Sequence, residues 1–401
     1  MGLSTAIANL GATLGLFEPC LTEKVADIFA QMNLNFLRDN VGIVMEPRDS
    51  NTPEILPIDQ SLIMNGDTFD IMRLDGLDPM IAWAMGSATG HTAIALWRED
   101  QLYLCESNAL SPYWPVNGIQ CNTFDDWMEF GRRNGYNVVW APLKRDLVAN
   151  FDIDAAWEFV DEHMGVDYGW EIVLMGLLDT AHGNEICTDT ARKNCVVAEH
   201  FELIFSIAEK YSKDAARVFK PAIMQRAQVD FELPIVEAYY RYNYIHYITL
   251  QQCNNWGFFC SAFINQGILP KDLHLIPEND TWMYPTLRNG EPFESDVSIC
   301  NVFTCKVLRE GGVFGDVEFN CGEFSVNDNY RLKIYEDNFE RPEVCIEWDP
   351  ENPLCQVLGK YKLRLDTQPG TLPRYNYVEP YNGFSNTCPA LAPDYTAPQN
   401  C

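Results

Sequence analysis

Residues 86–108, GSATGHTAIALWREDQLYLCESN, hold two apolar segments that flank a short polar loop. Thr92–Trp97 and Leu102–Glu106 have the length and composition of short β-strands, and Arg98–Gln101 has the length of a hairpin loop. A glycine-rich turn precedes the first of the two strands. The stretch therefore predicts an antiparallel hairpin, with a histidine at the head of one strand and a glutamate at the near end of the other.

These two residues, His91 and Glu106, are the first candidates for chemistry. A carboxylate that accepts a hydrogen bond from one imidazole nitrogen fixes the tautomer of the ring and raises the basicity of the other nitrogen. The pair therefore suits a general base and the residue that orients it. Two structural roles stay open: His91 capping its strand through backbone hydrogen bonds, and Glu106 ending a solvated strand.

Segments with strand and helix character alternate on both sides of the hairpin. Further strands are predicted at Phe69–Leu74 and Asn137–Pro142. Helices are predicted from apolar periodicity and from start and stop signals, at Thr22–Leu37, at Ala155–Met164 after Asp152 or Asp154 as N-cap, at 198–219, at 236–266, and at Ile299–Glu310 before Gly311-Gly312. The sequence thus predicts an α+β fold.

The last of these helices, CNVFTCKVLRE, begins near Cys300. The helix dipole and the unpaired N–H groups of a first turn favour a thiolate, and the same groups can stabilise an oxyanion. A nucleophile at a helix start, a base on a strand and an acid that orients the base form the arrangement of a thiol hydrolase. The structural alternative for a cysteine in an apolar helix is a buried small hydrophobe or half of a disulfide, and we expect one of these two roles for Cys305.

The order of these features resembles that of the permuted papain-like thiol hydrolases, relatives of the bacterial cell-wall amidases and the lecithin–retinol acyltransferases. Here the histidine strand comes before the cysteine helix, whereas in papain the cysteine helix comes first. More closely, the chain from about residue 40 to the C-terminus resembles a eukaryotic family found in protists and algae. The stretches that carry this closer likeness are LDGLDPMIAWAMGSATGHTAIAL, LYLCESNALSPYWPVNGIQ, YNVVWAPL, IPENDTW, REGGVFGD, LCQVLGKYKL and CPALAPDY.

The resemblance implies that Cys300 is the nucleophile, His91 the base and Glu106 the orienting residue. Asn301-Val302 departs from the family pattern, in which a small hydroxylic residue follows the cysteine. Cys260, in GFFCSAFINQG, is followed by serine and is therefore the alternative nucleophile. We prefer Cys300 because IPENDTWMYP before it and GGVFGD after it match the family around the nucleophile.

A substrate cleft is also implied by the resemblance. The segment Gly165–Trp170 resembles a Gly-x-x-Tyr segment that lines the cleft in this clan, which makes Tyr168 and Trp170 cleft candidates. Trp114 is a further candidate for the floor of an apolar cleft. The alternative for all three is a place in the core.

Three segments are expected along the chain. Residues 1–65 form a helical lead-in, and residues 66–312 form a permuted papain-like domain, a small antiparallel sheet packed on the cysteine-bearing helix, with a large helical insertion at about 150–295. Residues 313–401 form a Cys- and Pro-rich extension packed on that domain. Such a segment, poor in apolar periodicity, usually needs disulfides to hold one conformation.

The 14 cysteines indicate disulfides rather than zinc, because no Cys-x-x-Cys pair and no histidine with zinc-ligand spacing accompanies them. Disulfides indicate an oxidising compartment, so we expect a secreted protein or one of the lysosomal or vacuolar lumen. The sequon at Asn279 predicts N-glycosylation. The cysteine count is even, so a free Cys300 leaves at least one other cysteine unpaired, with Cys105 and Cys260 as candidates. Leu3–Phe17 fits either a weak signal peptide or the start of a mature chain.

A net charge of −29 excludes the classes of protein that bind phosphate backbones or anionic lipid by electrostatics. No run of 18 apolar residues is present, so no transmembrane segment is predicted. The histidines lack metal-ligand spacing, and no metal or cofactor is expected.

The sequence therefore predicts a thiol hydrolase or acyltransferase-like protein that cleaves an amide or an ester through a cysteine thioester. Its expected partners are a small-molecule, peptide or acyl substrate. The alternative is a catalytically inactive hydrolase scaffold that serves as an extracellular structural or interaction protein and binds other proteins.

Overall fold

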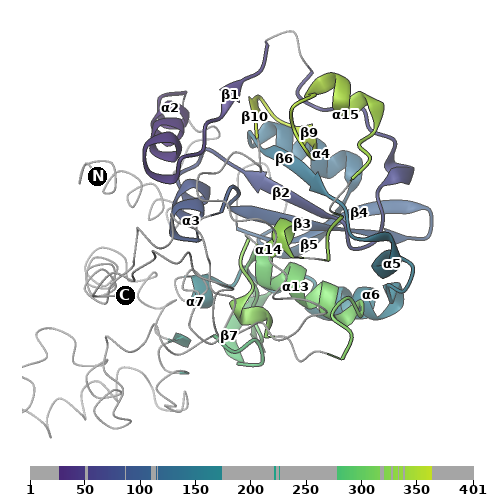
Figure 1. Cartoon of the computed structure of the whole chain (residues 1–401). Coiled ribbons are helices and arrows are strands. Elements are labelled where there is room, and N and C mark those ends of the chain that lie inside the picture. Colours follow the sequence, from purple (N-terminus) through teal and green to yellow (C-terminus); the bar gives the residue numbers. More distant parts are fainter. Residues whose placement is uncertain are drawn as a thin grey trace, which may run out of the picture.

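The computed structural model describes residues 27–49, 53–85, 87–109, 114, 116–173, 221–222, 225, 278–316, 320–326, 328–332, 334–336 and 339–363 (Figure 1). Its centre is a six-stranded sheet in the order β5-β4-β3-β2-β6-β9, with every neighbouring pair antiparallel. The strands are β2 (Thr68–Met72), β3 (His91–Arg98), β4 (Gln101–Asn108), β5 (Gly118–Thr123), β6 (Asn137–Ala141) and β9 (Cys355–Leu358). The strands predicted at Phe69–Leu74 and Asn137–Pro142 are confirmed as β2 and β6.

The predicted hairpin is confirmed as β3–β4. Ile94 pairs with Cys105 and Arg98 with Gln101, so Glu106 falls opposite residue 93. Successive side chains alternate between the two faces of a strand, so His91 and Glu106 lie on the same face as diagonal neighbours. The local pattern of the hairpin thus sets the distance between the two side chains.

Helices flank the sheet, and short strands lie outside it. The helices are α2 (Asp27–Phe36), α3 (Leu77–Met85), α4 (Phe124–Arg133), α5 (Arg145–Val148), α6 (Ile153–His163), α7 (Trp170–Val173), α13 (Cys300–Glu310), α14 (Asp328–Arg331) and α15 (Glu343–Trp348), with shorter helical turns η1 (Leu37–Val41), η2 (Gln60–Leu62) and η4 (Cys321–Glu323). The remaining strands are β1 (Glu46–Pro47), β7 (Tyr284–Arg288), β8 (Glu291–Ser295) and β10 (Tyr361–Lys362).

Two buried cores lie on the two faces of the sheet. Phe69 of β2 packs with Trp127 of α4 in one core, which α15 also covers. Ile94 of β3 packs with Phe303 of α13 and Val160 of α6 in the other. Figure 1 accordingly shows α4 and α15 above the sheet and α6 and α13 below it. The sheet is therefore the middle layer of three.

Local signals set the ends of two predicted helices. Asp152 caps α6 by accepting a hydrogen bond from the N–H of Ala155 at 3.0 Å, which confirms one of the two N-caps considered. α13 begins at Cys300 and ends before Gly311, within one residue of the prediction. The first residue of α13 is therefore the candidate nucleophile.

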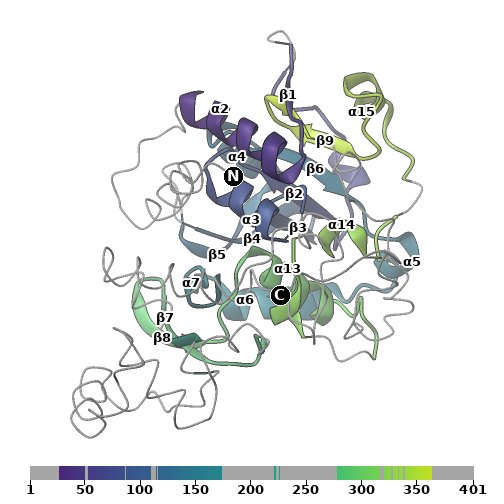
Figure 2. The same cartoon turned by 60° about the vertical axis from the view of Figure 1, so that its left-hand side comes forward.

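Strands from distant parts of the chain complete the structure. β9 pairs with β6 at the edge of the sheet. β10, which follows β9 in the sequence, pairs with β1 from the N-terminal part of the chain. The hairpin β7–β8 lies inside the segment 150–295, which was expected to be helical; Figure 2 shows it beside the lower layer. The helices predicted at 198–219 and 236–266, and the part of Thr22–Leu37 before Asp27, lie outside the described residues.

Disulfides tie neighbouring elements together, as the cysteine content predicted. They are Cys105–Cys121 between β4 and β5, Cys305–Cys321 between α13 and η4, and Cys345–Cys355 between α15 and β9. Of the two roles expected for Cys305, a buried small hydrophobe or half of a disulfide, the structure shows the disulfide. The expectation that Cys105 might be the spare thiol was wrong, because the β4–β5 register places it directly opposite Cys121.

The α+β prediction is confirmed by this mixture of helices with an antiparallel sheet. Within the described part of the chain, no helix combines the length and the apolarity needed to cross a bilayer. Three disulfides without a membrane-spanning helix among the described residues fit a secreted or lumenal protein.

Candidate functional site

His91 and Glu106 form a buried hydrogen-bonded pair. His91 Nε2 lies 2.6 Å from Glu106 Oε2, and the two side chains are 1% and 0% exposed. The juxtaposition that the hairpin predicted is therefore present, and neither side chain is a solvated strand end. Because Nε2 is engaged with the carboxylate, Nδ1 is the ring nitrogen left to face another group.

That other group is Cys300. Cys300 is close enough to His91 to raise the pKa of the imidazole, and its sulfur lies 3.7 Å from the side-chain oxygen of Asn301. Cys300 is a free cysteine at the first position of α13. The N-cap residue, Ile299, supplies no side chain to the first N–H groups of the helix. These N–H groups can therefore stabilise negative charge beside the sulfur.

The protonation of His91 reflects this neighbourhood. Burial lowers the pKa of His91, but the charge of Cys300 and the hydrogen bonds to Cys300 and Glu106 outweigh burial and raise the pKa to about 9. Arg73, which is also nearby, acts to lower it. A charged Cys300 and the Glu106 carboxylate therefore favour the imidazolium form of His91. An imidazolium beside a cysteine at a helix start is the environment that favours a thiolate.

Two of the three predicted cleft residues lie at Cys300. Burial together with the charge of the neighbouring Cys300 raises the pKa of Tyr168 well above its ordinary value. Trp170 packs on the small cluster that contains Cys300, and its ring lies 4.8 Å from that of Tyr168. Their role in lining a cleft stays a prediction.

The third, Trp114, lies on the other side of the histidine. Its ring stacks on Tyr136 at 5.1 Å, and Tyr136 lies edge-on to His91 at 6.3 Å. Trp114 is only 3% exposed and belongs to the core on the α4 face of the sheet. The structure therefore separates it from Tyr168 and Trp170.

The sequence interpretation missed one residue that touches the site. Trp127 of α4 donates its indole N–H to Glu106 Oε1 at 2.8 Å. The signal for α4 was present, because Phe124, Trp127, Met128 and Gly131 have the spacing of one helical face and form its buried side. The contact between the indole and Glu106 could not be predicted, because it depends on how α4 packs against β4.

A paired charge lies next to the histidine. Arg73 forms an ion pair with Asp78, in which the two closest atoms are 2.7 Å apart. The backbone of Gly90 also lies close to Asp78, because a Cβ atom at position 90 would be only 2.4 Å from the Cα of Asp78. The glycine turn before His91 therefore lets α3 pack against the head of β3.

The departure at Asn301 has a structural role. Its side-chain N–H₂ donates to the carbonyl oxygen of Phe324, which ties the start of α13 to the chain that follows η4. Val326 in that chain packs with Leu77 of α3 and with Cys300. Cys300 is 2% exposed beneath this cover. Leu77 and Val326 therefore contribute to the burial of the sulfur.

A second group of charges holds the chain that leads into α13. Asp296 accepts hydrogen bonds from His163 Nε2 at 2.9 Å and from Lys306 Nζ at 2.8 Å. The Lys306 side chain is fully buried. Burial raises the pKa of Asp296, but the hydrogen bond from His163 and the charge and hydrogen bond of Lys306 outweigh burial and hold it well below its ordinary value. Asp296 therefore links α6, α13 and the residues before Cys300.

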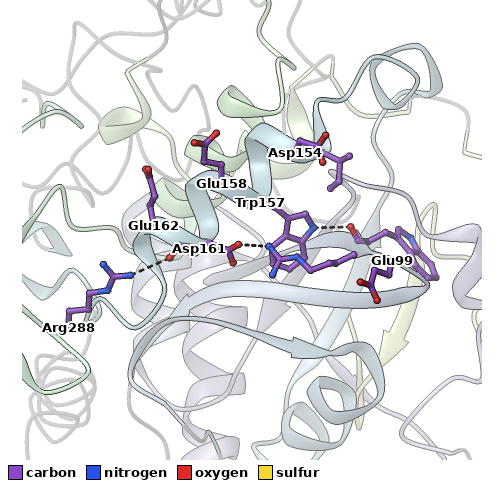
Figure 3. A pocket seen from close by; sticks show the side chains of 10 residues that line it. Glu99, Asp154, Trp157, Glu158, Asp161, Glu162 and Arg288 are labelled. Carbon is purple, nitrogen blue, oxygen red and sulfur yellow. Dashed lines mark hydrogen bonds and ion pairs between the residues drawn. The ribbon is translucent and has the colours of Figure 1, made fainter.

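A surface hollow of about 910 Å³ lies away from this site (Figure 3). Trp157, Glu158 and Glu162 of α6 line it, together with the end of β3. The Arg98 guanidinium lies 3.7 Å from the Trp157 ring centroid and 2.6 Å from Asp161. Since β3 runs from His91 to Arg98, the Arg98 end of the hollow is about 23 Å from the histidine.

Asn279 is exposed in the structure, with its side-chain oxygen accepting from the backbone and the hydroxyl of Thr281. This exposure is compatible with the predicted glycosylation. Cys260, the alternative nucleophile, lies outside the described residues. Among the residues that are described, no group of three or more His, Cys, Asp or Glu side chains could hold a metal ion.

Comparison of the chain with protein-family models, with characterised proteins and with solved structures finds no match. The resemblance to permuted papain-like hydrolases therefore stays a prediction. The arrangement of Cys300, His91 and Glu106 stands on its own geometry.

Proposed function

We propose that this protein is a thiol hydrolase or acyltransferase-like enzyme of a permuted papain-like type, with Cys300 as nucleophile, His91 as base and acid, and Glu106 as the residue that orients His91. The observation that carries the proposal is the buried, hydrogen-bonded pair of Glu106 and His91 beside a free cysteine at a helix start. The fold does not require a histidine–carboxylate pair, a free cysteine and a helix start to lie at one place. Together they match the requirements of covalent catalysis.

The reaction follows from the positions of these groups. The Cys300 thiolate attacks the carbonyl carbon of an amide or ester, and the N–H groups of the first turn of α13 stabilise the oxyanion that forms. The C–N or C–O bond then breaks while the His91 imidazolium gives its Nδ1 proton to the leaving amine or alcohol. Water, deprotonated by His91, attacks the thioester and releases the acid and Cys300. An alcohol or amine in place of water gives acyl transfer.

The test is the alkylation of native, unreduced protein with iodoacetamide, with the labelled cysteines mapped by mass spectrometry. The readout is the ratio of the Cys300 labelling rate at pH 6 to that at pH 9, because restricted access to the sulfur affects both rates equally. An ordinary thiol, with a pKa of about 8.5, labels about 200-fold more slowly at pH 6. A thiolate paired with an imidazolium labels at rates within about threefold of each other.

His91→Ala is the matched variant and is expected to restore the steep dependence on pH. An active enzyme also forms a thioester on Cys300 when it is incubated with p-nitrophenyl acyl esters of graded chain length, and hydroxylamine removes that thioester. Equal pH ratios for the wild-type protein and His91→Ala would rule out an activated cysteine. Labelling that maps to Cys260 and depends on His91 would move the nucleophile there.

The burial of the site favours a second candidate function. Cys300 and His91 are 2% and 1% exposed, as expected if the hydrolase scaffold is inactive and serves as an extracellular interaction protein. Such a scaffold needs no access to the sulfur. Absence of Cys300 labelling at every pH, while the unfolded protein labels fully, would favour this function over catalysis.

A further inference from the structure

Both oxygens of the Glu106 carboxylate are occupied by donors from different elements. Oε2 lies 2.6 Å from His91 Nε2, and Oε1 accepts from the Trp127 indole N–H at 2.8 Å. Trp127 and Glu106 are both fully buried. These are the two side-chain donors that the described part of the chain supplies to this carboxylate, so the position of Glu106 depends on both.

Aromatic rings enclose the Trp127 end of this arrangement. The indole lies edge-on to Trp114 at 5.9 Å, to Tyr136 at 6.0 Å and to Phe69 at 6.2 Å. Apolar surroundings of this kind make a hydrogen bond to a charged group stronger and make a missing one costlier. The indole N–H is therefore more than a packing contact for the carboxylate.

We propose that Trp127 is a positioning residue for the reaction, which acts on Cys300 through Glu106 and His91. The inference rests on the proposed function, because it assigns Trp127 to the same hydrogen-bonded series. The indole holds the carboxylate aimed at His91 Nε2. The carboxylate in turn stabilises the imidazolium that pairs with the Cys300 thiolate.

The effect of removing the indole N–H follows from this order. Trp127→Phe leaves Glu106 Oε1 without a donor in an apolar enclosure, which disfavours the ionised carboxylate. The imidazolium then loses stabilisation, and the neutral pair of thiol and imidazole becomes more populated at the expense of the ion pair. One hydrogen bond to a charged group corresponds to about a tenfold change in that balance. The ratio of Cys300 labelling at pH 6 to that at pH 9 is therefore expected to fall by up to about tenfold.

The chain offers a matched control. Trp140 is also fully buried and also donates its indole N–H to a buried carboxylate, Asp67 Oδ2, at 2.8 Å. Trp140→Phe thus removes the same indole donor from a carboxylate that does not touch His91, and Asp67 Oδ2 keeps the backbone N–H of Met64. We expect it to lower the stability of the protein and to leave the labelling ratio unchanged. A loss of stability alone therefore cannot imitate the effect expected of Trp127→Phe.

A double variant tests whether Trp127 acts through Glu106. Glu106→Gln alone is expected to lower the labelling ratio, and adding Trp127→Phe to it should lower the ratio by less than about twofold more. A labelling ratio in Trp127→Phe equal to that of the wild type overturns the inference, and so does an equal fall in Trp140→Phe. Both results leave the proposed function standing as long as His91→Ala abolishes the flat pH dependence. A wild-type protein with the steep pH dependence of an ordinary thiol overturns both.

Discussion

Lys306→Met should destabilise the protein because it removes one ion pair. The size of the loss in unfolding free energy follows from the structure. Lys306 Nζ lies 2.8 Å from Asp296 Oδ2, and the lysine side chain is fully buried. Removing one partner of a buried ion pair costs about 3–5 kcal/mol. Asp296 keeps its bond to His163, so the lower end of that range, about 3 kcal/mol, is expected. Methionine keeps the apolar stem of lysine, which limits the loss of packing.

The pH dependence of the Lys306→Met effect distinguishes the contribution of the ion pair from that of packing. The pKa of Asp296 is lowered in the folded protein, so the stabilisation is present above the ordinary aspartate pKa of about 3.9 and is lost as the pH falls towards the folded value. Removing Lys306 makes that lowering smaller. The difference in unfolding free energy between wild type and variant should therefore shrink below about pH 4, by at most about 1.4 kcal/mol per pH unit.

Urea unfolding followed by tryptophan fluorescence at pH 7, 4 and 2.5 measures this difference. Lys360→Met is the matched control: its ammonium lies 3.6 Å from Glu54 and the side chain is 56% exposed, so its effect should stay within about 0.5 kcal/mol. A Lys306→Met effect below about 1 kcal/mol at pH 7 would refute the buried-pair argument. An effect of the same size at pH 2.5 and at pH 7 would show that Lys306 stabilises by packing.

Three further predictions concern the cover, the disulfide and the sequon. Val326→Ala should raise the Cys300 alkylation rate several-fold at every pH and leave its pH ratio unchanged, because the variant thins the apolar layer over the sulfur without touching His91. Cys305→Ser paired with Cys321→Ser should lower the unfolding free energy by about 3 kcal/mol in chemical denaturation, as expected for a sequence separation of 16 residues. Asn279→Gln, expressed through a secretory pathway, should abolish a decrease in apparent mass on treatment with peptide N-glycosidase, whereas an unchanged wild-type mass on that treatment would contradict the glycosylation.

The sequence predicted the parts of the fold that local pattern determines. The β3–β4 hairpin follows from two short apolar segments and their loop, and the distance between His91 and Glu106 follows from the hairpin register. The extent of α13 follows from its apolar face and from the glycine that ends it. For this reason Cys300 could be placed at a helix start. The candidate site was therefore predictable where it depends on element boundaries and chain order.

Contacts between elements distant in sequence were not predictable. Nothing in CQVL indicates that β9 pairs with β6, because a strand of four residues carries no information about its partner. In the sequence, Trp127 has the pattern of a core residue and Lys306 that of a surface residue. The carboxylates to which they donate are determined only by how the elements pack. The register that joins Cys105 to Cys121 likewise required the β4–β5 pairing.

The charges around Cys300 differ from those of the chain as a whole. The net charge is −29, yet the charged groups beside the site are in ion pairs: Arg73 with Asp75 and Asp78, and His91 with Glu106. A thiolate surrounded by unpaired carboxylates would be disfavoured, because like charges at short distance raise the cost of ionisation. Pairing reduces that cost locally, and the N-terminus of α13 also favours negative charge at the sulfur. The acidity of the chain is therefore compatible with the activated cysteine that we propose.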